Sequence, residues 1–200
     1  MPDEAIPTRL DSKPYYSSAF GIGIVAAAVM TLALWIAQQA GWTKLDLAMT
    51  LGTVSGVVWG PSPGAWVQGF IAMLICGGLF ALVYAWLFEV QPAHTARAWS
   101  GGILGALHAI AGGALLGWTM PYLHPAMPNY PLLADPGFMA ANYGSQTVAV
   151  FVGIHVLYGA MVGCWMHYSR VDSKYLGWVK ALHDRARQRR GKAATTTAAQ

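Results

Sequence analysis

WSGGILGALHAIAGGALLGWTM, residues Trp99–Met120, contains no Asp, Glu, Lys or Arg along its whole length. The hydrocarbon core of a bilayer is about 30 Å thick, and an α-helix that rises about 1.5 Å per residue crosses it in about 20 residues. This segment is therefore long and apolar enough to span a membrane as one helix. Its many glycines predict close packing against neighbouring helices.

The rest of the chain repeats this pattern. Four stretches without a charged residue cover most of the 200 residues: Pro14–Thr43, Leu47–Phe88, Ala98–Ala134 and Pro136–Ser169. Charged residues make up 10% of the chain, whereas a soluble domain carries about 25%. The most apolar parts predict four spans: Ala19–Ala37, Trp66–Phe88, Trp99–Met120 and Thr147–His167. We therefore predict an all-α, polytopic membrane protein, with a four-transmembrane-helix bundle at residues 18–168, an N-terminal tail at 1–17 and a basic tail at 169–200.

The basic residues predict the orientation of the bundle. With four spans, all but one of the 12 Lys and Arg residues fall on the same side of the membrane, and Lys44 is the exception. The positive-inside rule assigns the basic side to the cytoplasm, so both termini are expected there. The first span follows a polar segment with three acidic residues, which is not the pattern of a cleaved signal peptide.

Aromatic residues lie near the ends of the predicted spans. They include Trp66, Tyr84 and Trp86 on the second span and Trp99 and Trp118 on the third. Trp and Tyr rings favour the headgroup level of a bilayer. We expect these side chains to form interfacial belts.

Two segments on the outer side are too apolar to be ordinary loops. Leu45–Gly60 is too short to span and predicts a short helix that either lies along the interface or enters the membrane and returns. Pro121–Gln146 holds five prolines, several aromatic residues and a single charge, Asp135. We expect it to fold onto the mouth of the bundle as a cap.

The C-terminal tail carries most of the positive charge. Ser173–Arg190 has apolar residues near helical spacing among many basic ones, which predicts an amphipathic helix beside the last span. Such a helix is expected to lie on anionic lipid headgroups. Nucleic acid is not expected as a partner, because no recognition motif accompanies the charges.

Two histidines, His108 and His155, lie near the middle of the third and fourth spans. At 100° per residue, Gly101 and Gly105 share a helix face with His108, and Gly159 shares one with His155. Two histidines at similar depth beside missing side chains are candidate ligands of a b-type haem. The alternative is that each neutral imidazole hydrogen-bonds a neighbouring helix. Small residues on two faces of the third span predict contacts with neighbours on both sides and a central position in the bundle.

The remaining chemistry-bearing residues do not form a recognised motif. Cys164 lies on the face opposite His155, and Cys76 lies near Met73, without the spacing of a dedicated metal site. The other histidines, His94, His124, His167 and His183, are expected in loops or at interfaces, exposed to water. We find no catalytic triad, carboxylate pair or phosphate loop, so we predict neither a catalytic site nor a metal site.

The order of these segments resembles an uncharacterised bacterial family of small four-helix integral membrane proteins, defined by a domain of unknown function. The likeness is carried by Leu45–Gly52 (LDLAMTLG), Gly77–Tyr84 (GGLFALVY), Gly101–His108 (GGILGALH) and His155–Gly163 (HVLYGAMVG). Members of that family often carry a His where this chain has Met73. The resemblance implies the bundle architecture and the inner (cytoplasmic) membrane of a bacterium, and it implies no activity.

Three functions are compatible with the sequence. The small-residue surfaces favour a non-enzymatic accessory or assembly subunit of a membrane complex, or a homo-oligomer, for which no cofactor is expected. The first alternative is an electron-transfer membrane subunit that binds haem b or a metal at His108 and His155. The second is a small transporter or channel, although the spans lack the charges that usually mark a solute path.

Overall fold

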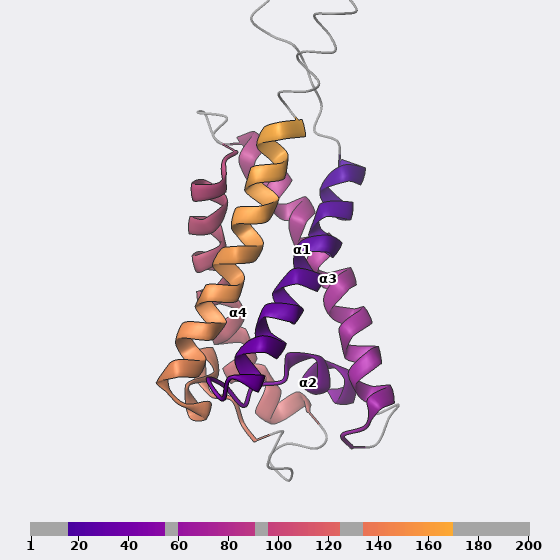
Figure 1. The fold of residues 1–200 in the computed structure, drawn as a ribbon, viewed down its shortest axis with the longest axis vertical. Helices are drawn as coiled ribbons and strands as arrows, with labels where there is room; N and C mark the ends of the chain where they lie inside the picture. Colours follow the sequence, from indigo (N-terminus) through magenta and orange to yellow (C-terminus); the bar gives the residue numbers. More distant parts are fainter. Residues whose placement is uncertain (1–15, 55–59, 91–95, 125–133, 170–200) are drawn as a thin grey trace, which may run out of the picture.

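The computed structural model describes residues 16–54, 60–90, 96–124 and 134–169, and all regular secondary structure in these residues is helical. Four helices are long and apolar enough to cross a membrane: α1 (Tyr16–Gln39), α3 (Pro63–Val90), α4 (Ala98–Leu123) and a last helix at Ser145–Ser169. They stand side by side as a bundle, and the described parts of the chain begin and end at the same end of it (Figure 1). The predicted four-helix transmembrane bundle is confirmed.

Local chemistry explains where the long helices begin. Ser62 accepts the backbone N–H of Ala65 at 3.1 Å, with Pro63 as the first residue of α3, an arrangement typical of a helix N-terminus. The Ser100 hydroxyl accepts the backbone N–H of Arg97 at 3.1 Å where α4 starts. The helix-starting signals therefore lie at the span ends, and the helices extend a few residues beyond the most apolar cores.

The predicted short outer helix is α2, Leu47–Val54. The Asp46 carboxylate accepts the N–H of Met49 at 2.9 Å, so this residue caps α2. Leu47, Ala48 and Thr50 are buried, and a Cβ added to Gly69 of α3 would overlap the carbonyl of Ala48. The segment is therefore packed against the start of α3, across the end of the bundle opposite the described chain ends (Figure 1).

Glycines join the long helices in two close pairs. A Cβ on Gly23 of α1 would overlap the backbone of Gly77 on α3. A Cβ on Gly101 of α4 would overlap the carbonyl of Gly159 on the last helix, and one on Gly105 would overlap the carbonyl of His155. Backbones approach this closely only where the side chain is absent. The bundle thus consists of an α1–α3 pair and a pair formed by α4 and the last helix.

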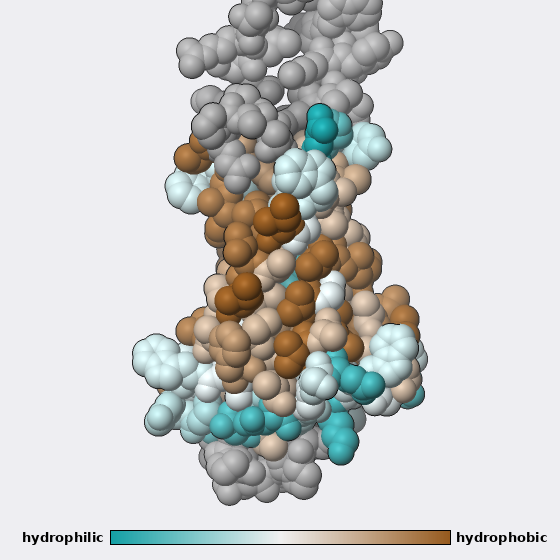
Figure 2. Space-filling model, turned by 90° about the vertical axis from the view of Figure 1, so that its left-hand side faces the viewer, coloured by the Kyte–Doolittle hydropathy of each residue, from teal (hydrophilic) through white to brown (hydrophobic). Residues whose placement is uncertain are grey.

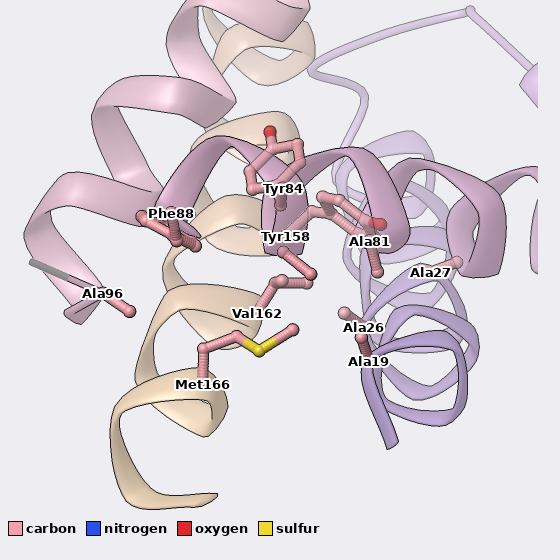
Figure 3. Packing of buried hydrophobic residues seen from close by; sticks show 11 residues of the cluster. Ala19, Ala26, Ala27, Ala81, Tyr84, Phe88, Ala96, Tyr158, Val162 and Met166 are labelled. Carbon is pink, nitrogen blue, oxygen red and sulfur yellow. The ribbon is translucent and has the colours of Figure 1, made fainter. Parts of the chain in front are cut away.

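Buried side chains fill the space between these pairs. One cluster brings Ala19, Ala26 and Ala27 of α1 against Val162 and Met166 of the last helix, with Ala81, Tyr84 and Phe88 of α3 beside them (Figure 3). Alanine on α1 gives room for the longer side chains of the last helix. Seen from the side, the surface of the molecule has a hydrophobic band between hydrophilic residues, as expected for a protein in a bilayer (Figure 2).

The prediction that the third span is central is wrong. Only 22% of the apolar window of α4 is buried, against 44% for Ser145–Ser169. Much of its second small-residue face packs against the outer cap rather than against another span, since Cβ atoms on Gly113 and Gly117 would overlap Met139 and Gly137 of the cap. The expected contact with two other spans is nevertheless present: α4 meets the last helix through glycines and α3 through His108.

The described part of the outer cap is folded onto the bundle, as predicted. It contains a short 3-10 helix, η2 (Phe138–Tyr143), which packs on α4. The Tyr143 hydroxyl donates to the carbonyl of Ala134 at 2.7 Å, and the Asp135 carboxylate accepts the N–H of Gly137 at 2.9 Å. Residues 125–133 of the cap lie outside the described residues, as do the N-terminal tail up to residue 15 and the basic segment Ser173–Arg190.

Candidate functional site

The structure brings the two predicted site residues together. The imidazole centroids of His108 on α4 and His155 on the last helix are 5.1 Å apart, and the ring planes are nearly perpendicular at 80°. His155 is 7% exposed, and His108 is partly buried. The Gly105–His155 backbone contact lies one turn from His108, so the close helix pair sets the distance between the two rings.

Each imidazole has a hydrogen-bonding partner inside the chain. His155 Nδ1 lies 2.7 Å from the carbonyl oxygen of Phe151, one turn earlier in the same helix. A carbonyl only accepts, so His155 Nδ1 carries a hydrogen. His108 Nδ1 lies 3.4 Å from the Tyr84 hydroxyl of α3, which is a long hydrogen bond between two spans.

Four aromatic rings surround the histidine pair. Phe80 lies 4.2 Å from His108 between centroids, and Phe151 lies 4.5 Å from His155. Tyr84 and Tyr158 meet edge to face at 5.7 Å, and the Tyr158 hydroxyl donates to the Gly77 carbonyl of α3 at 2.5 Å. We call the six residues His108, His155, Phe80, Tyr84, Phe151 and Tyr158 the histidine–aromatic cluster. It joins α3, α4 and the last helix at one place.

The aromatic members of this cluster were not predicted from the sequence. Tyr84 was expected in an interfacial belt, and it is instead 3% exposed and turned into the bundle. Phe80 and Tyr84 are four residues apart on α3, while His155 and Tyr158 are three apart on the last helix, so each pair shares a helix face. That spacing is the signal that could have placed them beside the histidines.

The cluster does not fit a haem between the two histidines. In the bis-histidine arrangement, the porphyrin plane separates the imidazoles and both ligate its iron. Here the rings of His108 and His155 contact one another directly. Phe80 and Phe151 occupy the space at their sides, so a porphyrin would have to displace them.

Among residues 16–54, 60–90, 96–124 and 134–169, no three His, Cys, Asp or Glu side chains are grouped as metal ligands. Cys76 is exposed, and Cys164 is partly exposed. Met73 is 5% exposed, and its sulfur lies 3.9 Å from the Thr31 hydroxyl of α1.

The remaining histidines differ in their surroundings. His167 is exposed, as expected, whereas His94 and His183 lie outside the described residues. The expectation for His124 is wrong, because this side chain is only 3% exposed. It follows directly on α4 in a proline-rich stretch, and nothing in that local sequence indicates that α2 covers it.

Comparisons with known protein families, with curated proteins and with solved structures find no match to this chain.

Proposed function

We propose that this protein is a non-enzymatic subunit of a membrane assembly, formed with other membrane proteins or with further copies of the chain. The observation that carries the proposal is the open side of α4. This helix is the least buried of the four spans within its own bundle. Large apolar side chains, each half or more exposed, follow one another along its length: Trp99, Ile103, Leu107, Ile110, Leu115 and Trp118.

The histidine–aromatic cluster supports a structural role for the two histidines. Its hydroxyl and imidazole groups bond to one another or to backbone carbonyls within the chain. Hydrogen bonds between membrane helices contribute about 0.6 kcal/mol each on average, and they fix which helix faces meet. Such a cluster acts as a connection between three spans without a bound group.

The small-residue surfaces contribute less to the proposed contact surface than the sequence indicated. Most glycines of the spans are used inside the bundle, where a Cβ would overlap a neighbouring helix or the cap. Gly21 and Gly153 are the span positions at which a Cβ would meet nothing within 4 Å among the described residues. The proposed contact surface therefore consists of the large side chains of α4 rather than of glycines.

The proposed location is the inner membrane of a bacterium, with both termini in the cytoplasm and the basic tail on anionic lipid headgroups. The charge distribution supports this orientation, since all but one of the 12 basic residues fall on the side of the termini. The common position of the first and last described residues at one end of the bundle is compatible with it. The resemblance to the bacterial four-helix family motivates the choice of membrane.

Cysteine crosslinking in native membranes tests the proposal. In a background with Cys76 and Cys164 changed to Ala, Leu107→Cys places a thiol on the open side of α4, and Val83→Cys places one on the outward side of α3. A bismaleimide reagent is expected to join the Leu107→Cys chain to a neighbour at native expression level and to leave the Val83→Cys chain largely single. Equal products from both positions, or none from either, would contradict the proposed surface.

A further inference from the structure

A pocket of about 300 Å³ opens where the chain leaves α1 and enters the last helix. Residues 41–44 form one wall and residues 143–146 form the other, and we call this cavity the outer pocket. Both walls lie at the end of the bundle opposite the described chain ends (Figure 1). The volume is at the lower end of the range for small-molecule sites, so the outer pocket has room for a small polar group.

Hydrogen bonds between the two walls hold the outer pocket in shape. The Thr43 hydroxyl lies 2.9 Å from the Thr147 hydroxyl and accepts the N–H of Leu45 at 3.0 Å. Because the Thr147 hydroxyl donates to the Tyr143 carbonyl at 3.1 Å, Thr43 is the donor to Thr147. Thr43 is 5% exposed and Thr147 is fully buried. The walls are therefore already in place before a ligand arrives, which lowers the cost of binding one.

The polar groups that line the outer pocket suit an anion. Lys44, Ser145 and Gln146 are lining residues and are exposed, so their side chains are available to a ligand. They supply an ammonium, a hydroxyl and an amide, all of which donate hydrogen bonds. Ser145 and Gln146 also begin the last helix, and the first backbone N–H groups of a helix have no partner inside it. The lysine charge and these additional donors together favour a negatively charged group.

The acidic side chains at this end are not part of the pocket wall. The Asp46 carboxylate accepts the N–H of Met49, and the Asp135 carboxylate accepts the N–H of Gly137. Lys44 is also the one basic residue that the charge distribution leaves on this side of the membrane, where the positive-inside rule disfavours it. Binding of an anion accounts for a lysine at this position.

The depth of the outer pocket indicates which anion it meets. Trp42 belongs to its wall and is 57% exposed, and Trp rings favour the headgroup level of a bilayer. Phosphate is the anionic group of phospholipids at that level. We infer that the outer pocket binds a phosphate group at the membrane surface, with the Lys44 ammonium as its positively charged partner. A phospholipid headgroup and a soluble phosphate ester both present this group. The inference does not depend on the proposed assembly.

Photolabelling in vesicles tests the site. The full chain is reconstituted in phosphatidylcholine vesicles with a trace of phosphatidylglycerol whose headgroup carries a diazirine, and labelled peptides are identified by mass spectrometry. We expect label at residues 41–44 and 143–146. Label on the basic tail, residues 169–200, serves as the reference within each sample. A zwitterionic phosphatidylcholine with the same diazirine reports labelling from proximity alone, and it should label the outer pocket less than the anionic probe does.

Substitutions at exposed positions separate the site from general attraction to an anionic membrane. Lys44→Gln removes the charge from the pocket wall and should lower pocket labelling, relative to the tail, by about fivefold. Arg97→Gln removes the same charge at the other end of the bundle and should leave that ratio unchanged. Gln146→Glu adds a negative charge to the pocket wall and should lower the ratio as well.

Competition shows which source of phosphate the outer pocket takes. Pocket labelling that persists in excess glycerol phosphate supports the site with a phospholipid as its occupant, whereas pocket labelling that glycerol phosphate abolishes supports it with a soluble phosphate ester. Equal pocket labelling of the unchanged chain by the anionic and the zwitterionic probe would overturn the inference even if no variant folds. A pocket-to-tail ratio that Lys44→Gln leaves unchanged would overturn it too.

Discussion

At the scale of single residues, the two mid-membrane histidines are explained by their neighbours. An imidazole inside a bilayer is costly unless its polar atoms are paired. His155 pairs with a carbonyl of its own helix, and His108 pairs with Tyr84 of another span. The presence of the two histidines at similar depth could be predicted from the sequence. Their edge-to-face contact could not, because it depends on how closely Gly105 lets the helices approach.

Substitution of His108 separates a structural role from a cofactor-binding one. His108→Gln keeps a hydrogen-bonding side chain of similar reach, so the free energy of unfolding should change by less than about 1 kcal/mol. His108→Leu should cost more, because the Tyr84 hydroxyl loses this partner. Unfolding in mixed micelles measures both changes, with the exposed His167→Gln as the control. A Soret band in the unchanged protein that either variant abolishes would show instead that the histidines hold haem.

At the scale of elements, glycine positions decide which helices form close pairs. The sequence predicted which helix faces consist of small residues. It did not indicate whether such a face is covered by another span or by a loop. On α4, the face with Gly101 and Gly105 packs against the last helix, whereas Gly113 and Gly117 pack against the cap. The two faces look the same in the sequence, because a position without a side chain can pack against the backbone of either a helix or a loop.

One pair of Gly→Ala substitutions tests this distinction. A methyl group on Gly105 would overlap the carbonyl of His155, whereas a methyl group on Gly153 would meet nothing within 4 Å in the described structure. Gly105→Ala should therefore lower the free energy of unfolding by about 1–3 kcal/mol, the usual cost of overpacking. Gly153→Ala should leave it unchanged or raise it by about 0.5–1 kcal/mol, because alanine favours a helix. Equal losses in the two variants, measured by unfolding in mixed micelles, would refute the proposed close pairs.

At the scale of the whole molecule, the uncharged runs were sufficient to predict the number of spans and their approximate limits. Length and hydropathy are local properties, so they are readable from one sequence. The position of α2 against α3 and the burial of His124 depend on contacts between segments far apart in the chain, for which the local pattern holds no signal. Contacts of this kind also decide which span is central, so the third span was wrongly predicted to be central although α4 is the least buried of the four.

We propose that this 21.4-kDa chain is a subunit of a larger membrane assembly and that its two mid-span histidines join helices without a cofactor. Native mass spectrometry of the protein released directly from membranes tests the assembly and shows whether a cofactor is bound. We predict a complex heavier than the single chain that dissociates to the 21.4-kDa polypeptide without added cofactor mass. A dominant species of one chain, alone or with a bound haem, would contradict this proposal.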